Sequence, residues 1–585
     1  MSAHDDGAFK HLYRDYESDE QAKLKETEIV RGLASGAVFE DPDFPCDGAS
    51  LYRNQFQPPK GSLPPAMVDW NRLNGGEVAG CASPQTFIGG QTPGDVMQGA
   101  LGDCWFLSSL SVLATRPSLV KRLIVSDTNA KKYGIYTVKF SKAGVWRYVT
   151  VDDRVPCSKC GKPLYARSLD PNETWVMILE KAYAKLHGCY EALTAGFIDY
   201  GLRDLTGAAT MKWKWADKKI KAKLDNNTLW SELLALKEEG SLLGCSNAIH
   251  GAEHSSASGL LSGHAYAILD MQEGHADASA EQDEINVKLI KLRNPWGQGE
   301  WKGDWSDASV LWKNYPAVKA QLGMTDVNDG TFFMAWDDFK KHFNQVFLAV
   351  DYPDEGSRIR YRGKWTPGDI KSGAGGYPAH ASWPQNPMYA FEVNQSTKLV
   401  AVVSQRDVRW QTLSAAGYEN GVGFVVMKLS TQSRAKKFSM KELAGMSRTY
   451  ASDRCCAGMM SLEPGRYTIV PSTYDPTKTM EPFILEINTD KQVQFEQEGD
   501  EIPDLDEAAE GEEDDEDDGG GEYDPEETFP TSTAGEAEPE EPGREISHLW
   551  SQAGELATLI KGLVAENKDL DARIKALEQF SVGAK

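Results

Sequence analysis

The stretch Gln98-Gly-Ala-Leu-Gly-Asp-Cys104-Trp-Phe-Leu-Ser-Ser-Leu110 predicts a glycine-rich turn that leads into an apolar helix. Cys104 falls in the first turn of that helix, where free backbone N–H groups and the positive end of the helix dipole favour a thiolate. Gln98 lies in the turn, so its side-chain amide and the Cys104 backbone N–H are placed to donate to an oxyanion. The stretch predicts a nucleophile for acyl transfer, although a single cysteine at a helix start is more commonly a small core residue.

A base and an orienting group for such a nucleophile follow later in the chain. His264 begins the apolar run His264-Ala-Tyr-Ala-Ile-Leu-Asp270, and Asn294 follows Lys291-Leu-Arg293 and precedes Pro-Trp-Gly297. Taken singly, the histidine is more commonly a core residue and the asparagine a turn former. Together with the cysteine they follow the papain-type order, in which an asparagine accepts from the imidazole N–H and fixes its tautomer without adding charge.

The acidic balance of the chain is local. Of the formal net charge of −25, 23 negative charges lie between Glu496 and Glu541, which contains no Lys or Arg, so the other residues together carry −2. A nearly neutral body predicts no nucleic-acid partner. The nine cysteines are scattered and do not form a disulfide framework. The acidic start, Met1-Ser-Ala-His-Asp-Asp6, and the lack of any apolar stretch near 18 residues predict a soluble cytoplasmic protein.

The helical periodicity predicts two helices outside the Cys104 segment. One lies near Asp19 to Leu33, with Ala22, Leu24, Ile29 and Val30 on an apolar face that packs on the next domain. The other, over Thr174 to His187, is expected to bury the single face that carries Trp175, Ile178, Leu179, Ala182 and Tyr183. Between them, Pro and Gly from Phe39 to Gly90 predict ordered coil.

Alternating or continuous apolar runs predict the strands. In the first half of the chain they fall at 133–140, 145–151, 241–245, 264–271 and 287–293. Between Tyr361 and Ile487 they recur at 388–393, 399–403, 423–429, 467–470 and 482–487, which is typical of an antiparallel β-sandwich. Cys157-Ser-Lys-Cys160 has no second pair of metal ligands, so an exposed turn is expected there instead of a zinc site.

The last ninety residues separate into two segments. Residues 496–541 contain too little apolar surface to order themselves, which predicts a disordered acidic linker. Its window Asp514–Pro525 is rejected as an EF-hand because Pro525 stands where a bidentate Glu is needed. Residues 544–580 predict a coiled-coil helix that forms a homodimer or binds a coiled-coil partner, the alternative being one helix docked on its own body. Its a and d positions are Ile546, Leu549, Ala553, Leu556, Ile560, Leu563, Asn567, Leu570, Ile574 and Leu577.

Several blocks of the sequence together resemble the calpains, calcium-regulated cysteine proteases of the papain-like class. They are Gln98 to Trp105, Leu179-Glu-Lys-Ala-Tyr-Ala-Lys185, Gly240-Ser-Leu-Leu-Gly-Cys-Ser246, Gly263-His-Ala-Tyr266, Arg293-Asn-Pro-Trp-Gly297 and Leu462 to Tyr474. The resemblance implies an α+β fold with a papain-like two-lobed core and a C2-like antiparallel β-sandwich. The expected parts are a helical extension (1–35), lobe 1 (36–208), lobe 2 (209–352), the sandwich (357–490), the linker (496–541) and the coiled coil (544–580).

By the same resemblance, Cys104 of lobe 1 meets His264 and Asn294 of lobe 2, with Gln98 in the oxyanion hole. Two calcium sites are implied, and hard oxygen ligands suit that ion. The first would use the carbonyls of Ile88 and Gly90 with Asp95 and Glu173; the second would use Glu300, Asp307, the Val327 carbonyl and Asp329. Thr331 replaces an acid common in the family, which predicts a weaker second site. Trp296 is implied as a gate that shields the His–Asn pair once calcium closes the lobes.

The chain also departs from the conventional calpains. It lacks their penta-EF-hand domain, and Val393-Asn-Gln-Ser-Thr-Lys398 replaces the acidic loop of their sandwich. The predicted function is a calcium-dependent cysteine endopeptidase that makes limited cuts in proteins, with Ca²⁺ as cofactor and peripheral membrane contact through the sandwich. The alternatives are a papain-like transglutaminase, a non-catalytic scaffold that assembles through its coiled coil, and an acidic calcium buffer.

Overall fold

The structure is a computed structural model of the chain, and all of its described residues belong to the compact unit Met1–Glu512. The described residues are 9–247, 254–278, 283–325, 327, 329–350, 356–411, 418, 420–429, 434–447, 450–496 and 500–502. The predicted coiled coil and nearly all of the predicted acidic linker lie outside them. No helix in this described part is long and apolar enough to cross a membrane.

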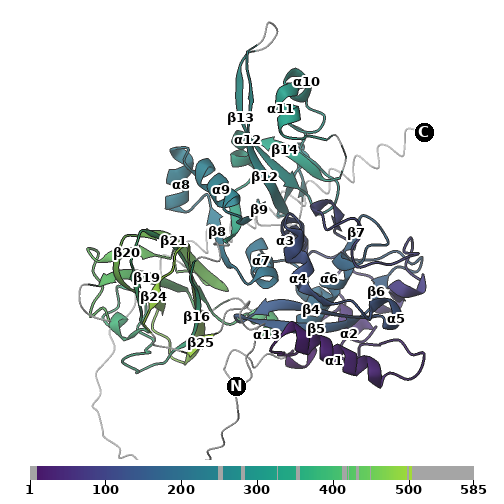
Figure 1. The fold of residues 1–585 in the computed structure, drawn as a ribbon, viewed down its shortest axis with the longest axis horizontal. Helices are drawn as coiled ribbons and strands as arrows, with labels where there is room; N and C mark the ends of the chain where they lie inside the picture. The colour runs from purple at the N-terminus through teal and green to yellow at the C-terminus, as the bar shows by residue number, and fades with distance from the viewer. Residues whose placement is uncertain are drawn as a thin grey trace, which may run out of the picture. The chain divides into compact units, whose positions relative to one another are not determined.

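Lobe 1 is built around one buried helix, α3 (Cys104–Leu113), which begins at the cysteine as predicted. The three-stranded sheet β3-β4-β5 and the helices α6 and α7 surround it (Figure 1). The other elements of the lobe are α1 (Asp19–Gly32), α2 (Gly48–Leu51), β1 (Asp69–Arg72), β2 (Val96–Met97), α4 (Pro117–Leu123), β3 (Ile124–Ser126), α5 (Ala130–Tyr133), β4 (Ile135–Lys142), β5 (Val145–Asp152), β6 (Arg154–Cys157), β7 (Arg167–Ser168), α6 (Trp175–Leu186) and α7 (Ile198–Thr206). Short 3₁₀ helices lie at Lys10–Leu12, Pro65–Met67, Leu73–Gly75, Pro93–Asp95 and Tyr190–Leu193.

Two expectations for the helices of lobe 1 are corrected in detail. Helix α6 is buried on every side and not along one face, because Lys181 and Lys185 lie inside and form ion pairs with Asp152 and Asp41. Helix α1 packs on the lobe as predicted, but Leu24 of its expected apolar face is 65% exposed. A helix whose charged residues form buried ion pairs needs no face toward solvent. Helical periodicity, which assumes that charged residues are exposed, therefore underestimates the burial of α6.

The segment from Phe39 to Gly90 is mostly ordered coil, as predicted, but it contains one strand. Strand β1 pairs antiparallel with β6 along the edge of the lobe. Its sequence, Asp-Trp-Asn-Arg, has no apolar alternation, so the pairing comes from backbone hydrogen bonds that the pattern of side chains does not reveal.

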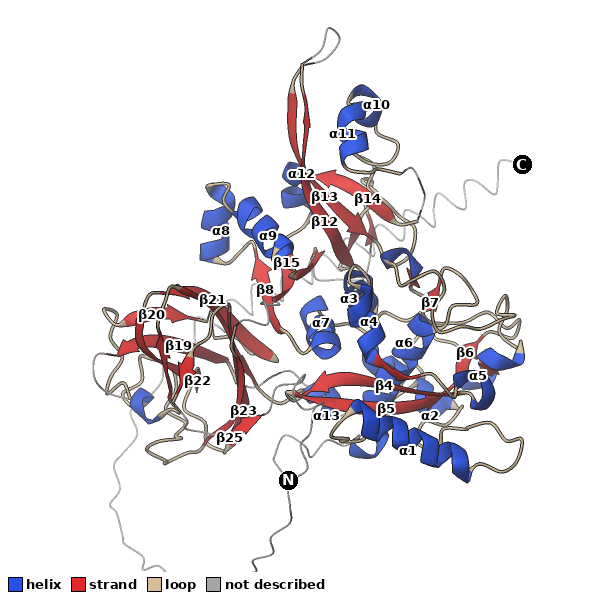
Figure 2. Ribbon diagram, in the orientation of Figure 1, coloured by secondary structure: helices blue, strands red, loops and turns tan. Residues whose placement is uncertain are grey.

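Lobe 2 is a six-stranded antiparallel sheet in the order β14-β13-β12-β9-β15-β8 (Figure 2). Its strands are β8 (Ala209–Lys214), β9 (Leu242–Ser246), β12 (Ala265–Ala276), β13 (Ile285–Arg293), β14 (Thr331–Ala335) and β15 (Gln345–Val350). The helices α8 (Lys218–Asp225), α9 (Leu229–Glu238), α10 (Leu311–Asn314), α11 (Pro316–Gln321) and α12 (Trp336–His342), and the pair β10 (His254–Ser255) and β11 (Leu261–Ser262), complete the lobe.

The two faces of β12 explain how the lobes join. Successive side chains of a strand point to opposite faces. Tyr266 and Ile268 enter the core of lobe 2, whereas Ala265 and Ala267 belong to the core of lobe 1. The small alanines let helix α3 approach the sheet closely, and the Ser108 hydroxyl of α3 donates to the Ala265 carbonyl at 3.0 Å.

The third part is an antiparallel β-sandwich, as predicted, with the sheets β21-β18-β23-β16-β25 and β20-β19-β22-β17-β24 around a shared apolar core. Its elements are β16 (Arg358–Trp365), β17 (Tyr389–Val393), β18 (Thr397–Ser404), α13 (Val408–Gln411), β19 (Val422–Leu429), β20 (Leu443–Met446), β21 (Cys455–Leu462), β22 (Gly465–Thr473), β23 (Glu481–Thr489), β24 (Gln494–Phe495) and β25 (Asp500–Ile502), with a 3₁₀ turn at Trp383–Gln385.

One boundary of the predicted acidic linker is wrong. The linker was expected from Glu496, but Asp500–Ile502 form β25, which pairs antiparallel with β16. An edge strand offers unpaired backbone groups to any extended segment, so composition did not reveal this pairing. The sandwich therefore extends through β24 and β25 to Ile502, past its predicted end at residue 490.

We expect the contact between α1 and lobe 1 to depend on one buried carboxylate. Glu26 accepts from Ser126, Asn129 and Thr137 at 2.8, 2.9 and 2.6 Å. Replacing it, in Glu26→Ala, leaves buried donors without an acceptor and should cost about 2 kcal/mol or more, seen as a lower Tm in calorimetry. The control on the same helix is Glu28→Ala, which removes an exposed pair with Lys25 and should cost about 0.5 kcal/mol or less. Equal Tm values for the two variants would contradict the assignment.

Candidate active site

Cys104 is the first residue of α3 and the part of that helix closest to the surface. It is 9% exposed, whereas every other residue of α3 is at most 1% exposed. The turn before Cys104 packs tightly against the backbone around Tyr165. A Cβ on Gly99 would lie 2.3 Å from the Tyr165 carbonyl oxygen, so only glycine fits there. The turn therefore holds the thiol at the N-terminus of the helix, where a thiolate is favoured.

His264 and Asn294 form a hydrogen-bonded pair, His264 just before β12 and Asn294 just after the neighbouring strand β13. The distance between His264 Nε2 and Asn294 Oδ1 is 2.9 Å, and both side chains are buried. The oxygen and nitrogen of the Asn294 side-chain amide cannot be exchanged by a flip. Its Nδ2 donates to the Gly299 carbonyl at 3.0 Å, and its Oδ1 accepts the Trp296 N–H at 3.0 Å. His264 Nε2 must then carry the proton, which leaves Nδ1 as the basic nitrogen of the neutral ring.

Three contacts bring the cysteine half and the histidine half of the site together. Helix α3 lies against β12 one turn after Cys104 and one residue after His264, through the Ser108–Ala265 bond. The Gln98 N–H donates to the Pro295 carbonyl at 2.8 Å. The Arg293 guanidinium donates to the carbonyls of Val96 and Gly94 at 2.7 and 2.9 Å. These contacts join the chain around Cys104 to the chain around His264 and Asn294, and the triad itself stays a prediction that they favour.

Gln98 is buried beside the nucleophile's turn. Its Nε2 donates to the Leu101 carbonyl at 2.7 Å, which orients the amide within the turn that leads to Cys104. One N–H of that amide is used by this bond, and the other is the group that an oxyanion would need. The oxyanion role of Gln98 stays a prediction that this placement favours.

Trp296 covers the His264–Asn294 pair. Its ring centroid lies 5.3 Å from that of His264, at an interplanar angle of 66°, and the indole is only half-buried. An aromatic ring in this position keeps water from the buried hydrogen bond and so strengthens it. The gating role expected for Trp296 stays a prediction, because the structure shows only this covering position.

A buried carboxyl pair that we did not predict from the sequence is formed by Asp103, the residue before Cys104, and Glu180 of α6. Burial raises the pKa of Asp103 to about 7, and burial together with the Asp103 charge raises that of Glu180 well above its usual range. Glu180 also accepts the Ala166 N–H at 3.0 Å. Two carboxyl groups in one apolar site cannot both ionise easily, because the charge on one raises the pKa of the other. Asp103 lies in the block Gln98 to Trp105 and Glu180 in the block Leu179 to Lys185, so the resemblance to the calpains was the signal that could have pointed to them.

The residues expected for the first calcium site lie together in lobe 1. Glu173 Oε1 accepts the Ile88 N–H at 2.9 Å, and Asp95 caps its own turn by accepting from Thr92. Burial, and then the nearby Asp95 charge, raises the pKa of Glu173 to about 7. Within the described part of the chain neither carboxylate forms an ion pair. The Arg293 charge acts on Asp95 from nearby, and two carboxylates beside a carbonyl-rich loop through Gly90 fit a calcium ion.

The residues expected for the second calcium site lie in loops next to Asn294. Glu300 accepts the Gly330 N–H at 2.9 Å, and Asp329 Oδ1 accepts the Thr331 N–H at 2.8 Å. The Asp329 N–H donates to the Val327 carbonyl at 2.8 Å, and Asp307 is half-buried on a neighbouring loop. The donor set is again carboxylates and a carbonyl, which suits Ca²⁺, with Thr331 contributing no charge.

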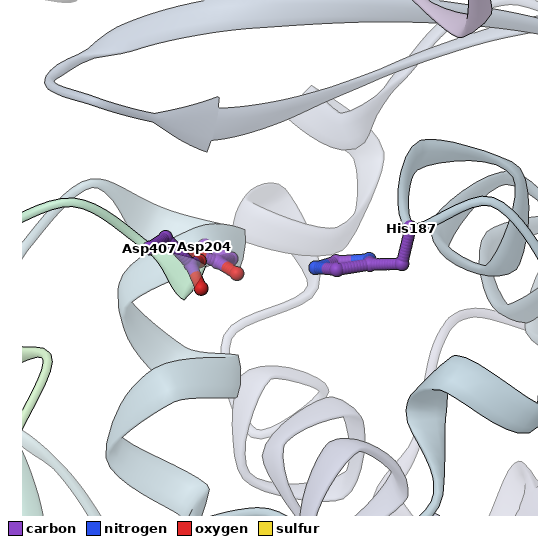
Figure 3. Close-up of side chains that lie close together, drawn as sticks. All are labelled: His187, Asp204 and Asp407. Carbon is purple, nitrogen blue, oxygen red and sulfur yellow. The ribbon is translucent and has the colours of Figure 1, made fainter. Parts of the chain in front are cut away.

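A third cluster of metal-type ligands is filled by the protein's own cation. His187, Asp204 and Asp407 point toward one another (Figure 3). The Lys142 ammonium nitrogen lies among them, 3.0 Å from His187 Nε2 and 2.9 Å from Asp407 Oδ2, and it also pairs with Asp204. Burial, and then the Lys142 charge, lowers the pKa of His187 to about 3, so the imidazole stays neutral. The cluster is an ionic contact between lobe 1 and the sandwich, with the metal position taken by a lysine.

A two-lobed fold with a cysteine at the start of a buried helix of lobe 1, and a hydrogen-bonded histidine–asparagine pair in lobe 2, is typical of the class of cysteine proteases. Comparison with known families identifies the particular one. Residues 39–349 match the family described as "Calpain family cysteine protease", and residues 361–488 match "Calpain large subunit, domain III". The chain belongs to the calpain family.

Individual relatives agree with that assignment. The chain is 34% identical over 508 residues to "Calpain-type cysteine protease ADL1" of Oryza sativa subsp. japonica, which covers 82% of this chain and 22% of that protein. It is 35% identical over 478 residues to "Calpain-type cysteine protease DEK1" of Zea mays, covering 78% and 21%. It is 32% identical over 526 residues to "Calpain-2 catalytic subunit" of Mus musculus, covering 85% and 70%. The chain thus spans about a fifth of the length of these two plant relatives.

The raised pKa of Glu173 predicts a pH dependence of stability that can be measured without metal. Its folded pKa of about 7 exceeds the ordinary 4.5, so the folded chain loses stability as the pH rises from 4.5 through 7 and the buried acid ionises. Glu173→Gln stays neutral and keeps an acceptor for Ile88. In the presence of a chelator its Tm should exceed that of the wild type at pH 8, and the difference should shrink toward pH 5.

The matched control for this experiment is Glu238→Gln. Glu238 is exposed, at the end of α9, and its neutralisation should leave the pH dependence of Tm unchanged. A Tm of Glu173→Gln that never exceeds the wild type between pH 5 and 8 would show that Glu173 ionises without cost in the folded chain.

Proposed function

We propose that the chain is a calcium-dependent cysteine endopeptidase that makes limited cuts in protein substrates. The observation that carries the proposal is the His264–Asn294 hydrogen bond, locked in one orientation and held against the helix that begins with Cys104. In this assignment Cys104 is the nucleophile, His264 the base and then the acid, Asn294 the orienting group, and Gln98 an oxyanion donor.

The chemistry follows from the tautomer that Asn294 imposes. His264 Nδ1 takes the thiol proton of Cys104, and the thiolate attacks the peptide carbonyl carbon. The oxyanion accepts hydrogen bonds from the Gln98 amide and the Cys104 N–H. His264 then gives its proton to the leaving amine, and a thioester forms. Attack by water, with His264 again as base, releases the acid and restores the thiol.

Both calcium loops connect to the residues around Asn294, which supports calcium control. Asp95 lies between Gly94 and Val96, whose carbonyls accept from Arg293. On the other side, the Asn294 N–H donates to the Gly330 carbonyl at 2.8 Å, and the Gly330 N–H donates to Glu300. Bound calcium would neutralise the carboxylates of these loops. The loops would then hold Arg293 and Asn294 from both lobes and so fix the position of His264 relative to Cys104.

A pocket beside the nucleophile's turn fits the proposed substrate class. It has a volume of about 410 Å³ and opens next to Gly102, two residues before Cys104. Its wall combines Tyr52, Leu63, Leu101 and Tyr165 with the polar Glu191. A cavity of this size and apolar character takes a large side chain of a bound peptide.

Cys104→Ser should abolish casein hydrolysis at millimolar calcium, because the hydroxyl is not activated as the thiol is. Covalent labelling by the epoxide inhibitor E-64, followed by mass spectrometry, should occur at Cys104 and require calcium. The control is Cys160→Ser, which removes an exposed thiol and should leave hydrolysis and labelling unchanged.

The same assay separates the alternatives. Persistent casein cleavage by Cys104→Ser would refute the nucleophile. A wild-type chain that E-64 never labels would favour the non-catalytic scaffold. Incorporation of a primary amine into glutamine side chains, without peptide cleavage, would favour a transglutaminase, a class that typically has Asp where this chain has Asn294.

Calcium control gives a fourth prediction. Asp95→Asn removes one ligand charge of the first site and should raise the calcium concentration for half-maximal hydrolysis about tenfold or more. Because a proton and calcium compete for Glu173, the wild-type midpoint should fall as the pH is raised from 6 to 8. Tryptophan fluorescence gives an independent reading of binding. The control is Asp127→Asn, an exposed acid whose loss should leave the midpoint unchanged.

The contribution of the C-terminal segments is tested in the same titration. We propose that residues 546–577 mediate self-association or bind a coiled-coil partner in the cytoplasm, and that the sandwich makes any membrane contact. A chain ending at Glu512 keeps β25 and should show the full-length calcium midpoint. A shifted midpoint would assign calcium control to the removed residues. A full-length chain that is monomeric by light scattering would exclude self-association.

A further inference from the structure

One segment of the sandwich leaves its own sheets and packs on lobe 1. After β18 the chain turns at Gln405 and forms the short helix α13. Trp410 of this helix is 1% exposed and belongs to the core of lobe 1, where its ring lies 5.3 Å from that of Tyr13. The segment is therefore part of the protease lobe by its packing, although it belongs to the sandwich by its connectivity.

An ionic cluster fixes where this segment begins. Asp407 accepts from Lys142 of lobe 1 at 2.9 Å and lies 3.3 Å from Arg454 Nε of the sandwich. Arg454 also pairs with Asp204 of lobe 1 at 2.6 Å. All of these groups are buried, and Asp407 is the least buried of them, with 10% of its side chain exposed. Buried charge pairs have strict geometric demands, so the cluster places residues 408–410 in register on lobe 1.

Arg409 extends from this anchored segment to the neighbourhood of the nucleophile. Its guanidinium donates to the carbonyls of Ala192 and Ala195, the first at 3.2 Å. It also lies over the indole of Trp105, 5.1 Å from the ring centroid, in a cation–π contact. Trp105 is the residue that follows Cys104.

The loop held by Arg409 in turn holds the chain on both sides of Cys104, at Gly102 and at Trp105. The Ala195 N–H donates to the Gly102 carbonyl at 2.9 Å, and the Trp105 indole N–H donates to the Leu193 carbonyl at 2.8 Å. Ala195 has a φ of +58°, a conformation that a residue with a Cβ keeps only when its surroundings enforce it. The hydrogen bonds from Arg409 and to Gly102 supply that enforcement.

We propose that Arg409 is a positioning residue for the peptidase, supplied to lobe 1 by the sandwich. It acts through Trp105 and the loop 192–195, and it touches neither substrate nor the thiol. The inference rests on the proposed function, since it assigns Arg409 a role in the reactivity of Cys104. If Arg409 has this role, the packing of the sandwich on lobe 1 determines the geometry of the turn from Gln98 to Cys104.

The test compares Arg409→Ala and Arg409→Lys with the control Arg406→Ala in the full chain. Arg406 is exposed, three residues earlier in the same segment, so its replacement makes the same change of charge. The readouts are kcat and KM for a peptide substrate and the rate of Cys104 carboxamidomethylation by iodoacetamide against pH, followed by mass spectrometry, with Tm as the measure of folding.

Arg409→Ala should lower both kcat and the alkylation rate of Cys104 about tenfold or more, with a smaller change in KM, because misplacing a reacting group costs rate and not substrate binding. Arg409→Lys keeps the charge over Trp105 but loses the planar guanidinium that donates to two carbonyls. Its kcat and its Cys104 alkylation rate should therefore lie between those of Arg409→Ala and the wild type. Arg406→Ala should match the wild type in every readout.

Two outcomes separate the inference from the proposed function. Alkylation and kcat of both Arg409 variants equal to those of Arg406→Ala would overturn the positioning role while leaving the peptidase intact. A wild-type chain without peptide hydrolysis would overturn the proposed function, and a lower alkylation rate in the variants would still support the positioning of Cys104. If Arg409→Ala lowers Tm enough to unfold the chain, Arg409→Lys decides: wild-type alkylation by that variant overturns the inference.

Discussion

The buried guanidinium of Arg293 makes the interaction on which the candidate site depends, because it ties the part of lobe 1 that carries Cys104 to the part of lobe 2 that carries His264 and Asn294. It belongs to a strand of lobe 2, yet its donors bind Val96 and Gly94 of lobe 1, and Asn294 is the next residue. Burial lowers its pKa only to about 10, so it stays charged at neutral pH. A charged group in this position strengthens its hydrogen bonds and penalises any arrangement that separates it from its acceptors.

Buried polar groups with hydrogen-bond or ion-pair partners orient the side chains of the site and align the domains. Asn294 uses its oxygen twice and its nitrogen once, which leaves His264 with one tautomer. Between lobe 1 and the sandwich, Lys142 and Arg454 neutralise Asp204 and its neighbours. Such networks contribute less to stability than to alignment, because each charge tolerates only a narrow range of partner positions. Ionic contacts therefore align the core and its sandwich alongside the apolar contact that Val400, Val402 and Ala457 make with the core of lobe 2.

The parts of the site that were predicted share one property: they are encoded by short runs of neighbouring residues. The turn that ends at Cys104, the position of His264 beside a strand and Asn294 before a proline all follow from local sequence. Strand β15 was missed although Gln-Val-Phe-Leu-Ala-Val is a nearly continuous apolar run, whereas two other missed strands lack such a signal. Strand β21, beginning Cys455-Cys-Ala-Gly, has no alternation of branched apolar residues, and β25 lies in an acidic run, so only their neighbours in the sheet reveal them.

By itself, the sequence determined the class of protein and the helix that begins at Cys104, because both follow from residue types in short runs. The triad order and the calcium carboxylates stay predictions, and the carboxylates rest on the family resemblance. The tertiary structure alone decided that Asp103 and Glu180 share a buried site and that Arg409 reaches Trp105 from another domain. It also decided that a lysine fills the metal-like cluster around Asp204. These features join residues tens to hundreds of positions apart, and their energies come from burial and charge proximity, which no local spacing encodes.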